Sequence, residues 1–171
     1  FNYLTAMSKG NLNENHMVVD RHGNTYLTFT YTDLLVVDGL DFYNSTGWTS
    51  ILLKFNTDGN LIWGYSFVNT GSTTIKSIAL DKGDGVVVSG SFHDTLYVDG
   101  ETFISNGGDD ALVVGFSSEG NIRYVNCFGS VLSDEATNVC VDKTGNKFVL
   151  TTLHEALTFA GETVTPIDDA Y

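Results

Sequence analysis

Proline and cysteine are nearly missing from this chain, whose 171 residues include one proline and two cysteines, Cys127 and Cys140. Two cysteines cannot build the dense disulfide framework that holds many small secreted domains together. One proline beside 18 glycines, with many threonine, valine, tyrosine and phenylalanine residues, is typical of short strands joined by tight turns. We therefore expect an all-β fold without a disulfide framework.

Basic residues are also scarce, with 8 lysines and arginines against 21 acidic residues and a net charge of −13. This charge repels phosphate backbones and anionic membrane surfaces, so we expect no nucleic-acid partner and no membrane insertion. A cationic partner or a divalent metal is easier to accommodate. No apolar run approaches the ~18 residues of a transmembrane helix, and no basic and apolar leader starts at Phe1. We expect either a removed leader or an internal fragment of a longer protein.

Familiar catalytic patterns are absent as well. The sequence has no Gly-x-Ser-x-Gly motif, no zinc-spaced cysteines or histidines and no nucleophile with an obvious partner. The run Gly107-Gly108-Asp109-Asp110 is not a phosphate loop, because no Lys-Ser/Thr pair follows it. Asn44-Ser45-Thr46 satisfies the glycosylation sequon, which matters only if a eukaryotic secretory pathway made the chain.

The sequence does contain a repeat of 61 residues. Moving the chain by 61 positions aligns it with itself without a gap (81 − 20 = 142 − 81 = 61). Three columns of this alignment are Asp20, Asp81 and Asp142; Gly39, Gly100 and Gly161; and Leu35, Leu96 and Leu157. With 42% apolar and 12% aromatic residues, the chain also has enough material for a sizeable core.

Each repeat predicts four short strands and an additional hairpin. First strands are expected at 16–19, 77–80 and 138–141, and second strands at 25–31, 86–92 and 147–153. Third strands at 50–55 and 111–116 are nearly continuous in apolar residues, as expected when both faces are covered. Fourth strands follow, with Leu61, Trp63, Tyr65 and Phe67 alternating onto one face. No stretch has a 3.6-residue period, so we expect no helix longer than a turn or two.

The additional hairpin turns at Asp38-Gly39 in the first copy. Counting outward from this turn places Leu35 opposite Phe42 and, one repeat later, Leu96 opposite Phe103. In the third copy Ala160-Gly161 occupies the turn, and Leu157 is expected to face Val164. Residues 8–15 are expected to be a polar connection, and residues 1–5 the last strand of a preceding unit.

The two cysteines fall in different units of this scheme. Cys127 lies in an outermost strand and Cys140 in the innermost strand of the next unit, whereas a disulfide needs Cα atoms within ~7 Å. We therefore expect both thiols to be unbridged. Cys140 shares its column with Ala79 and Val18, so we also expect it to be a small buried residue.

A unit of four strands and a hairpin is too long for one coil of a solenoid, and it suits one blade of a β-propeller. The expected division is the end of a preceding blade at 1–16, blades at 17–77 and 78–138, and a partial blade at 139–171. Each blade should be an antiparallel sheet with its first strand innermost, and successive sheets should stack face to face. A closed propeller needs about 4 to 8 blades. The roughly 2.8 repeats present (171/61) therefore imply further blades from the same chain or from an assembly.

The order of these features resembles a known family. The pattern begins with two apolar residues, the turn Asp-x-x-Gly-Asn and an aromatic residue. The Asp-Gly hairpin comes next, followed by Gly-Asp-Asp-Ala-Leu-Val-Val at 108–114 and by Glu-Gly-Asn before an aromatic strand. This pattern is similar to the SBBP family of bacterial β-propeller repeats over essentially the whole chain. The resemblance implies a scaffold in a secreted or surface protein, often beside adhesion modules, without shared catalytic residues. The first copy departs from it at Trp48-Thr49, which replace Asp109-Asp110, and Phe29 and Thr151 replace Gly90.

Several polar residues are candidates for a site. His93 and His154 are equivalent, and an acidic residue follows each, so they could bind a metal or act as general bases. Polar residues that end a strand in each blade would give the same pattern. The Asp-x-x-Gly-Asn turns loosely resemble Ca²⁺ loops, but they lack the spaced ligands and the distal glutamate of an EF-hand. Ordinary turn chemistry explains them better, so we expect no cofactor, with Ca²⁺ as the alternative, and the sequence leaves any metal unidentified.

The loops differ between the two sides of the predicted blades. The short hairpins repeat their residues, whereas the links at 8–15, 69–76 and 130–137 diverge completely. We hypothesise that a partner docks on the face of these links, where Asp134 and Glu135 supply negative charge, with Asp109 and Asp110 as further candidates. Unconstrained drift of the links is the alternative.

The function expected from these features is a secreted or cell-surface scaffold that binds a protein or a glycan and is not catalytic. The alternative is part of a catalytic propeller, such as a glycan-processing hydrolase or lyase with an acidic site at its axis. An enzyme should break the symmetry of the repeat with a polar constellation in one place, whereas a scaffold should keep its blades interchangeable.

Overall fold

The computed structural model describes residues 6–8, 11–159 and 162–165. Within these ranges the chain forms strands, turns and loops, and none of it is helical. All strand pairs are antiparallel. The prediction of an all-β fold without long helices is therefore confirmed. These residues also include no helix that is long and apolar enough to cross a membrane.

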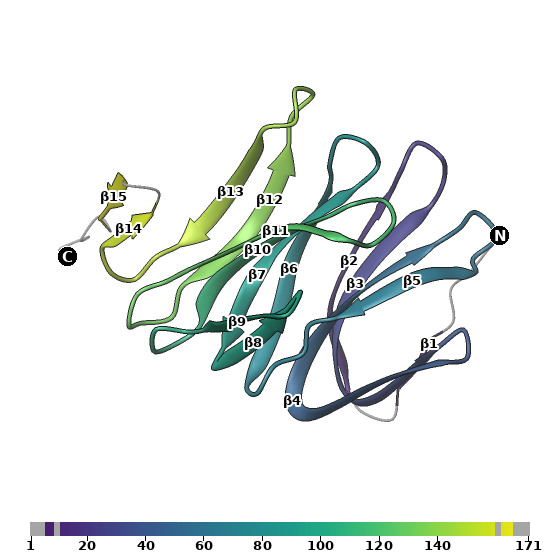
Figure 1. Cartoon of the computed structure of the whole chain (residues 1–171), viewed down its shortest axis with the longest axis horizontal. Coiled ribbons are helices and arrows are strands. Elements are labelled where there is room, and N and C mark those ends of the chain that lie inside the picture. Colours follow the sequence, from purple (N-terminus) through teal and green to yellow (C-terminus); the bar gives the residue numbers. More distant parts are fainter. Residues whose placement is uncertain (1–5, 9–10, 160–161, 166–171) are drawn as a thin grey trace.

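Three sheets follow one another along the chain (Figure 1). The first contains β2 (Leu12–Val19), β3 (Thr25–Val37), β4 (Leu40–Phe55) and β5 (Leu61–Ser66), with β1 (Ala6–Ser8) paired to the far end of β3. The second contains β6 (Ser72–Leu80), β7 (Val86–His93), β10 (Asp110–Phe116) and β11 (Ile122–Phe128). The third contains β12 (Glu135–Val141) and β13 (Lys147–Thr152).

Two small hairpins project from the second and third sheets. They are β8 (Thr95–Val98) with β9 (Glu101–Ile104), and β14 (Leu157–Phe159) with β15 (Glu162–Val164). Residues 12–66, 72–128 and 135–164 are called the first, second and third unit below.

The three sheets are separate and stack face to face. One apolar cluster joins the first unit to the second, and a smaller cluster joins the second to the third. Figure 1 shows the sheets side by side, with the first unit on the right and the third on the left. Over the described residues they form an open stack that does not close into a ring.

Pairing registers recur 61 residues apart. Leu12 pairs with Tyr31, and 61 positions later Thr73 pairs with Phe92. The pairing of β1 with the first hairpin, through Ser8 and Leu35, recurs as the bridge between Asn69 and Leu96. The opening strand of every unit also carries a bulge in the same place, between Asn13 and His16, Ile75 and Ser77, and Ala136 and Asn138. The sequence repeat therefore corresponds to a repeat of backbone geometry.

The register expected for the additional hairpins is confirmed. Leu35 faces Phe42, Leu96 faces Phe103, and Leu157 faces Val164. Asp38 and Gly39 have φ of 50° and 79°, and Asp99 and Gly100 have φ of 52° and 80°. Two consecutive positive φ angles match the twist of a two-residue hairpin, which explains the Asp-Gly pair. The predicted Ala160-Gly161 turn lies outside the described residues.

The core lies where the third strands are covered on both faces, as predicted. Ile51, Leu52 and Leu53 of β4 are fully buried, as are Leu112 and Val114 of β10. Aromatic residues of β5 and of the segment that follows it pack onto β10. The Phe116 ring centroid lies 5.2 Å from that of Tyr65, 6.1 Å from that of Phe67 and 6.3 Å from that of Trp63.

The opening strands are longer than predicted. Half of the expected polar connection at 8–15 belongs to β2, which begins at Leu12, because the backbone keeps pairing beyond the bulge. The expected divisions after residues 16, 77 and 138 therefore fall inside β2, β6 and β12. The chain passes from one sheet to the next at 67–71 and 129–134. The predicted boundaries differ because the repeat period gives the length of a unit but not the residue at which a unit starts. The strand expected at 1–5 lies outside the described residues.

The two cysteines are free. Cys127 is half-buried, but Cys140 is exposed, which contradicts its predicted burial. Val139 and Val141 pack toward the second unit, so strand alternation turns Cys140 to the opposite side of β12, which no described sheet covers. Column position therefore predicted the strand but not the burial of this thiol.

Candidate functional site

A polar crevice of about 250 Å³ lies where the opening strands of the three units meet. Its walls combine acidic, basic, hydroxyl, amide and aromatic side chains: Asn13, Glu14, Thr30, Trp48, Thr74, Lys76, Ser91, Asp109 and Glu135. Several are in equivalent positions, such as Asn13, Thr74 and Glu135, each 61 residues apart. The crevice is therefore built from corresponding parts of neighbouring units.

Lys76 joins two units across this crevice. It lies at the bulge of β6, between Ile75 and Ser77, where the ladder shifts by one residue. A bulge redirects the side chain of its extra residue. The Lys76 ammonium lies 2.9 Å from the Glu135 carboxylate, and both side chains are about 30% exposed (29% and 30%). Glu135 is therefore an ion-pair partner of the second unit.

Glu14 occupies the matching bulge of the first unit. Its φ of 46° lies in the left-handed region, which side-chain-bearing residues rarely adopt. Its carboxylate lies 3.9 Å from the His16 ring, whose Nε2 is buried without a hydrogen-bond partner among the described residues. Strained conformations of this kind concentrate at functional sites.

His93 contacts an acid other than its sequence neighbour. Its Nδ1 lies 3.6 Å from Asp109 Oδ1, because pairing of Phe92 with Asp110 brings the ends of β7 and β10 together. Both side chains are partly exposed, and Asp109 also lines the crevice. The structure therefore combines two predicted site residues, His93 and Asp109.

Asp134 lies inside the protein, which contradicts its predicted role as an exposed negative charge. Its carboxylate is fully buried and accepts hydrogen bonds from the backbone N–H groups of Ser130 and His154, the latter at 2.9 Å. Burial raises the pKa of Asp134, but these N–H donors outweigh it and hold the pKa below its usual value. The His154 ring lies against the Ser133 carbonyl, so His154 belongs to this loop and not to the crevice.

Asp110 is also buried and bound internally. Its carboxylate accepts a hydrogen bond of 3.2 Å from the backbone N–H of Asn106 and one of 3.4 Å from the Asn106 amide. Burial raises the pKa of Asp110, and the carboxylates of Asp134 and Asp109 add to the effect. Neither buried carboxylate is presented to a partner.

The preceding junction shows that these two acids occupy structural positions. Moving back by 61 residues, Asp110 corresponds to Thr49 and Asp134 to Thr73. There the amide of Asn69 donates to both threonine hydroxyls, at 2.6 Å and 3.1 Å. Both junctions therefore satisfy buried polar groups with hydrogen bonds, one with neutral groups and one with carboxylates.

In the Asp-x-x-Gly-Asn turns, the aspartate carboxylate accepts hydrogen bonds from residues of its own turn. Asp20 accepts hydrogen bonds from the backbone N–H groups of His22 and Asn24 and from the Asn24 amide. Asp142 accepts the corresponding bonds from Thr144 and Asn146. The carboxylate oxygens of Asp20 and Asp142 are therefore engaged in hydrogen bonds within the turns. No group of three or more histidine, cysteine or acidic side chains is arranged for a metal in the ranges that the structure describes.

The remaining candidate residues are engaged within the protein. The side-chain amide of Asn44, the sequon residue, donates to the Gly47 carbonyl at 2.6 Å. Lys76 and Glu14 belong to the crevice, and sequence analysis named neither; it named Trp48 only as the residue that replaces Asp109 in the first copy. The sequence feature that could have pointed to them is the difference between equivalent positions, since Asn15 and Thr137 stand where the second unit has Lys76.

Comparison with protein-family models found no match, and comparison with curated proteins found none either. The chemistry of the crevice is therefore inferred from its own side chains. These offer carboxylates, one ammonium group, hydroxyls and an indole ring within a small volume.

Proposed function

We propose that the chain is part of a secreted or cell-surface β-propeller that acts as a binding scaffold. Separate antiparallel sheets stacked face to face, with registers and bulges recurring every 61 residues, support the propeller. Further blades, from the same chain or an assembly, belong to this proposal. The proposed location rests on the resemblance to SBBP repeats.

The polar crevice is the observation that carries the binding role. It lies on the side of the divergent links, because Asn13 and Glu14, Thr74 and Lys76, and Glu135 come from the three link regions. In a propeller the same positions surround the mouth of the axis, where loops commonly place ligand contacts.

The ligand proposed for this crevice is a sugar residue of a glycan. A volume of 250 Å³ is below the range of about 300 to 1,000 Å³ of pockets for drug-sized molecules, so it suits one ring. Asp109 and the part-exposed hydroxyl of Thr74 can bond sugar hydroxyls, and the half-buried indole of Trp48 offers an apolar face. The −13 net charge favours a neutral or cationic sugar over an anionic one.

Binding to a glycan panel tests this proposal, followed by titration of the glycans retained. Asp109→Asn and Trp48→Ala should each weaken binding by about tenfold or more, because each removes a direct contact. The matched controls are Asp58→Asn and Glu119→Gln, two exposed acids in the short turns on the opposite side. Loss of binding in the control variants with retention in the crevice variants would contradict the proposal.

A catalytic propeller is the second candidate, and one observation favours it. Charged residues break the repeat at the crevice: Glu14, Lys76 and Glu135 each have uncharged counterparts in the other units. Turnover of the bound glycans decides between the two. Product release that Glu135→Gln abolishes, with binding retained, would establish an enzyme; binding without turnover supports the scaffold.

A further inference from the structure

An apolar groove of about 750 Å³ lies between the second and third units, on the side away from the crevice strands. Its floor is the face of β10 and β11, with Val113, Tyr124 and Phe128, and its wall is formed by β13 and the last hairpin, with Val149, Leu153 and Leu157. The lining is mainly apolar. Removing this surface from water would therefore lower the free energy of the protein.

The same face is covered in the first unit. Val113, Tyr124 and Phe128 correspond to Leu52, Trp63 and Phe67, each 61 residues earlier. There β10 of the second unit covers the face with Leu112, Val114 and Phe116, which are all fully buried.

Only part of this cover recurs at the next junction. Ala136 and Val139 of β12 pack on the second unit as Ile75 and Ile78 of β6 pack on the first. Among the described residues, none takes the place of Phe116 in the apolar cluster at this junction. The groove is therefore the space that a third strand fills one junction earlier.

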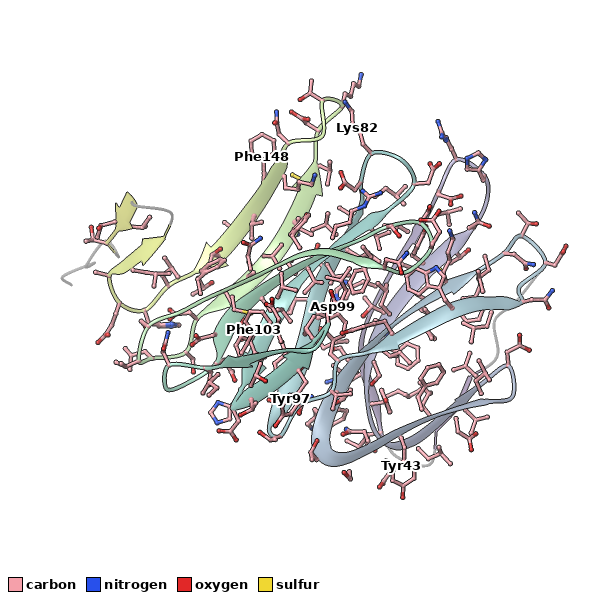
Figure 2. All side chains as sticks on the ribbon, in the orientation of Figure 1. Tyr43, Lys82, Tyr97, Asp99, Phe103 and Phe148 are labelled. Carbon is pink, nitrogen blue, oxygen red and sulfur yellow. The ribbon has the colours of Figure 1, made fainter. Side chains whose placement is uncertain are left out.

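The exposure of β13 points to the same space. β7 is paired with β6 on one side and β10 on the other, and its residues from Val86 to Phe92 are buried. β13 pairs with β12 alone among the described strands. A groove-facing side chain of β13 is therefore exposed although its counterpart is buried: Val149 is 36% exposed, against 0% for Val88 of β7. Phe148 lies on the opposite face of β13, where its ring points away from the body of the molecule (Figure 2), and it does not line the groove.

A polar group in the groove indicates what the missing cover contains. Trp63 Nε1 donates to the carbonyl of Ser118, in the turn between β10 and β11, at 3.1 Å. Tyr124 holds the equivalent position, and its buried hydroxyl has no hydrogen-bond partner in the described part of the chain. Buried polar groups are normally paired, so a carbonyl of a corresponding turn fits this position.

We propose that this groove binds a β-hairpin with the chemistry of the third and fourth strands of the repeat. The hairpin adds antiparallel to the free edge of β13. Its first strand has aliphatic, aliphatic and phenylalanine residues at alternate positions, as in Ile51-x-Leu53-x-Phe55 and Leu112-x-Val114-x-Phe116. The phenylalanine lies over Tyr124 and Phe128, and a carbonyl of its turn accepts from the Tyr124 hydroxyl. Strand addition of this kind combines backbone pairing with side-chain pockets.

Appending a copy of residues 111–130 directly after Tyr171 tests the proposal, because the offset of 61 then places Ala111 of the copy at position 172. Hydrogen exchange of the β13 amides should slow by on the order of 100-fold, and the melting temperature should rise. The matched control carries Leu112→Asp, Val114→Asp and Phe116→Asp in the appended copy only, and it should leave exchange at the rate of the unextended chain. Equal exchange rates in the two extended proteins, or no slowing in either, would overturn the proposal.

This inference does not depend on what the crevice binds. The appended copy lies away from the crevice residues, so glycan binding and protection of β13 are separate readouts. Protection without binding would leave the hairpin site standing and remove the proposed ligand.

Discussion

Phe116→Ala is the most direct test of the packing between the first and second units. The Phe116 side chain is fully buried, and its ring lies within 6.3 Å of three aromatic rings, those of Trp63, Tyr65 and Phe67. Removing a buried phenylalanine costs about 3 to 5 kcal/mol. The three aromatic neighbours place this site at the upper end, since each favourable ring pair adds about 0.5 to 1.5 kcal/mol beyond buried area.

Urea unfolding followed by tryptophan fluorescence measures this loss, because Trp63 stacks on Phe116 with an interplanar angle of 22°. A loss of about 4 to 5 kcal/mol is a large part of the roughly 5 to 15 kcal/mol that stabilises a domain. Phe116→Leu should therefore be measured too, with an expected loss of about 1 to 2 kcal/mol. It keeps the experiment informative if the alanine variant does not fold.

Phe148→Ala is the matched control. It removes the same side chain from a strand residue that is 57% exposed, so it should change the free energy of unfolding by no more than about 0.5 kcal/mol. Phe116→Ala with a loss below about 1 kcal/mol, or with the same loss as Phe148→Ala, would refute the inference that Phe116 joins the two units.

Three further outcomes follow from individual residues. Burial raises the pKa of Cys127 to about 12. The exposed Cys140 should therefore react with a thiol reagent at pH 8 at least about 100-fold faster than Cys127, as measured by peptide mass mapping. Equal reaction rates of the two thiols would contradict the buried position of Cys127. The raised pKa of Asp110 means that its ionisation destabilises the fold as pH rises above the unfolded value of about 3.9, so Asp110→Asn should raise the melting temperature at pH 7 and lose this advantage below about pH 4. Hydrogen bonds from Thr144 and Asn146 lower the pKa of Asp142. The ionised carboxylate therefore stabilises the fold above about pH 3.9, and this stabilisation is lost as pH falls further. Asp142→Ala should lower the melting temperature at pH 7, and the melting temperature of the variant should decrease less on acidification than that of the unmodified protein.

The interpretation of the links changes once burial is known. Sequence comparison drew attention to Asp134 and Glu135 as neighbours with the same charge. The structure separates them, because Asp134 turns into the protein and Glu135 turns to Lys76 in the second unit. The separation arises where the link ends: Asp134 precedes β12 and accepts hydrogen bonds from the Ser130 and His154 N–H groups, whereas Glu135 is the first residue of the strand.

Much of the fold could be predicted because it depends on neighbours along the chain. The 61-residue period, the strands, the absence of helices in the described residues and the pairing of Leu35 with Phe42 all follow from local patterns. An Asp-Gly turn needs only its own backbone angles, so its register could be counted from the sequence. The phase of the repeat was harder to find, since polar residues such as Asn13 extend β2 beyond its apolar part.

Residue patterns along the chain were enough to predict repeated strands and turns, with an apolar third strand and short hairpins at fixed positions. Which side chains meet depends on how the folded units pack. The crevice collects Glu14, Lys76 and Glu135 from units about 60 residues apart, and no local pattern specifies such a contact. Burial also depends on what packs against a strand. Val87 and Phe148 hold equivalent positions, yet one is buried and the other exposed, because β12 packs over the face of Val87 and no described strand packs over the same face of β13.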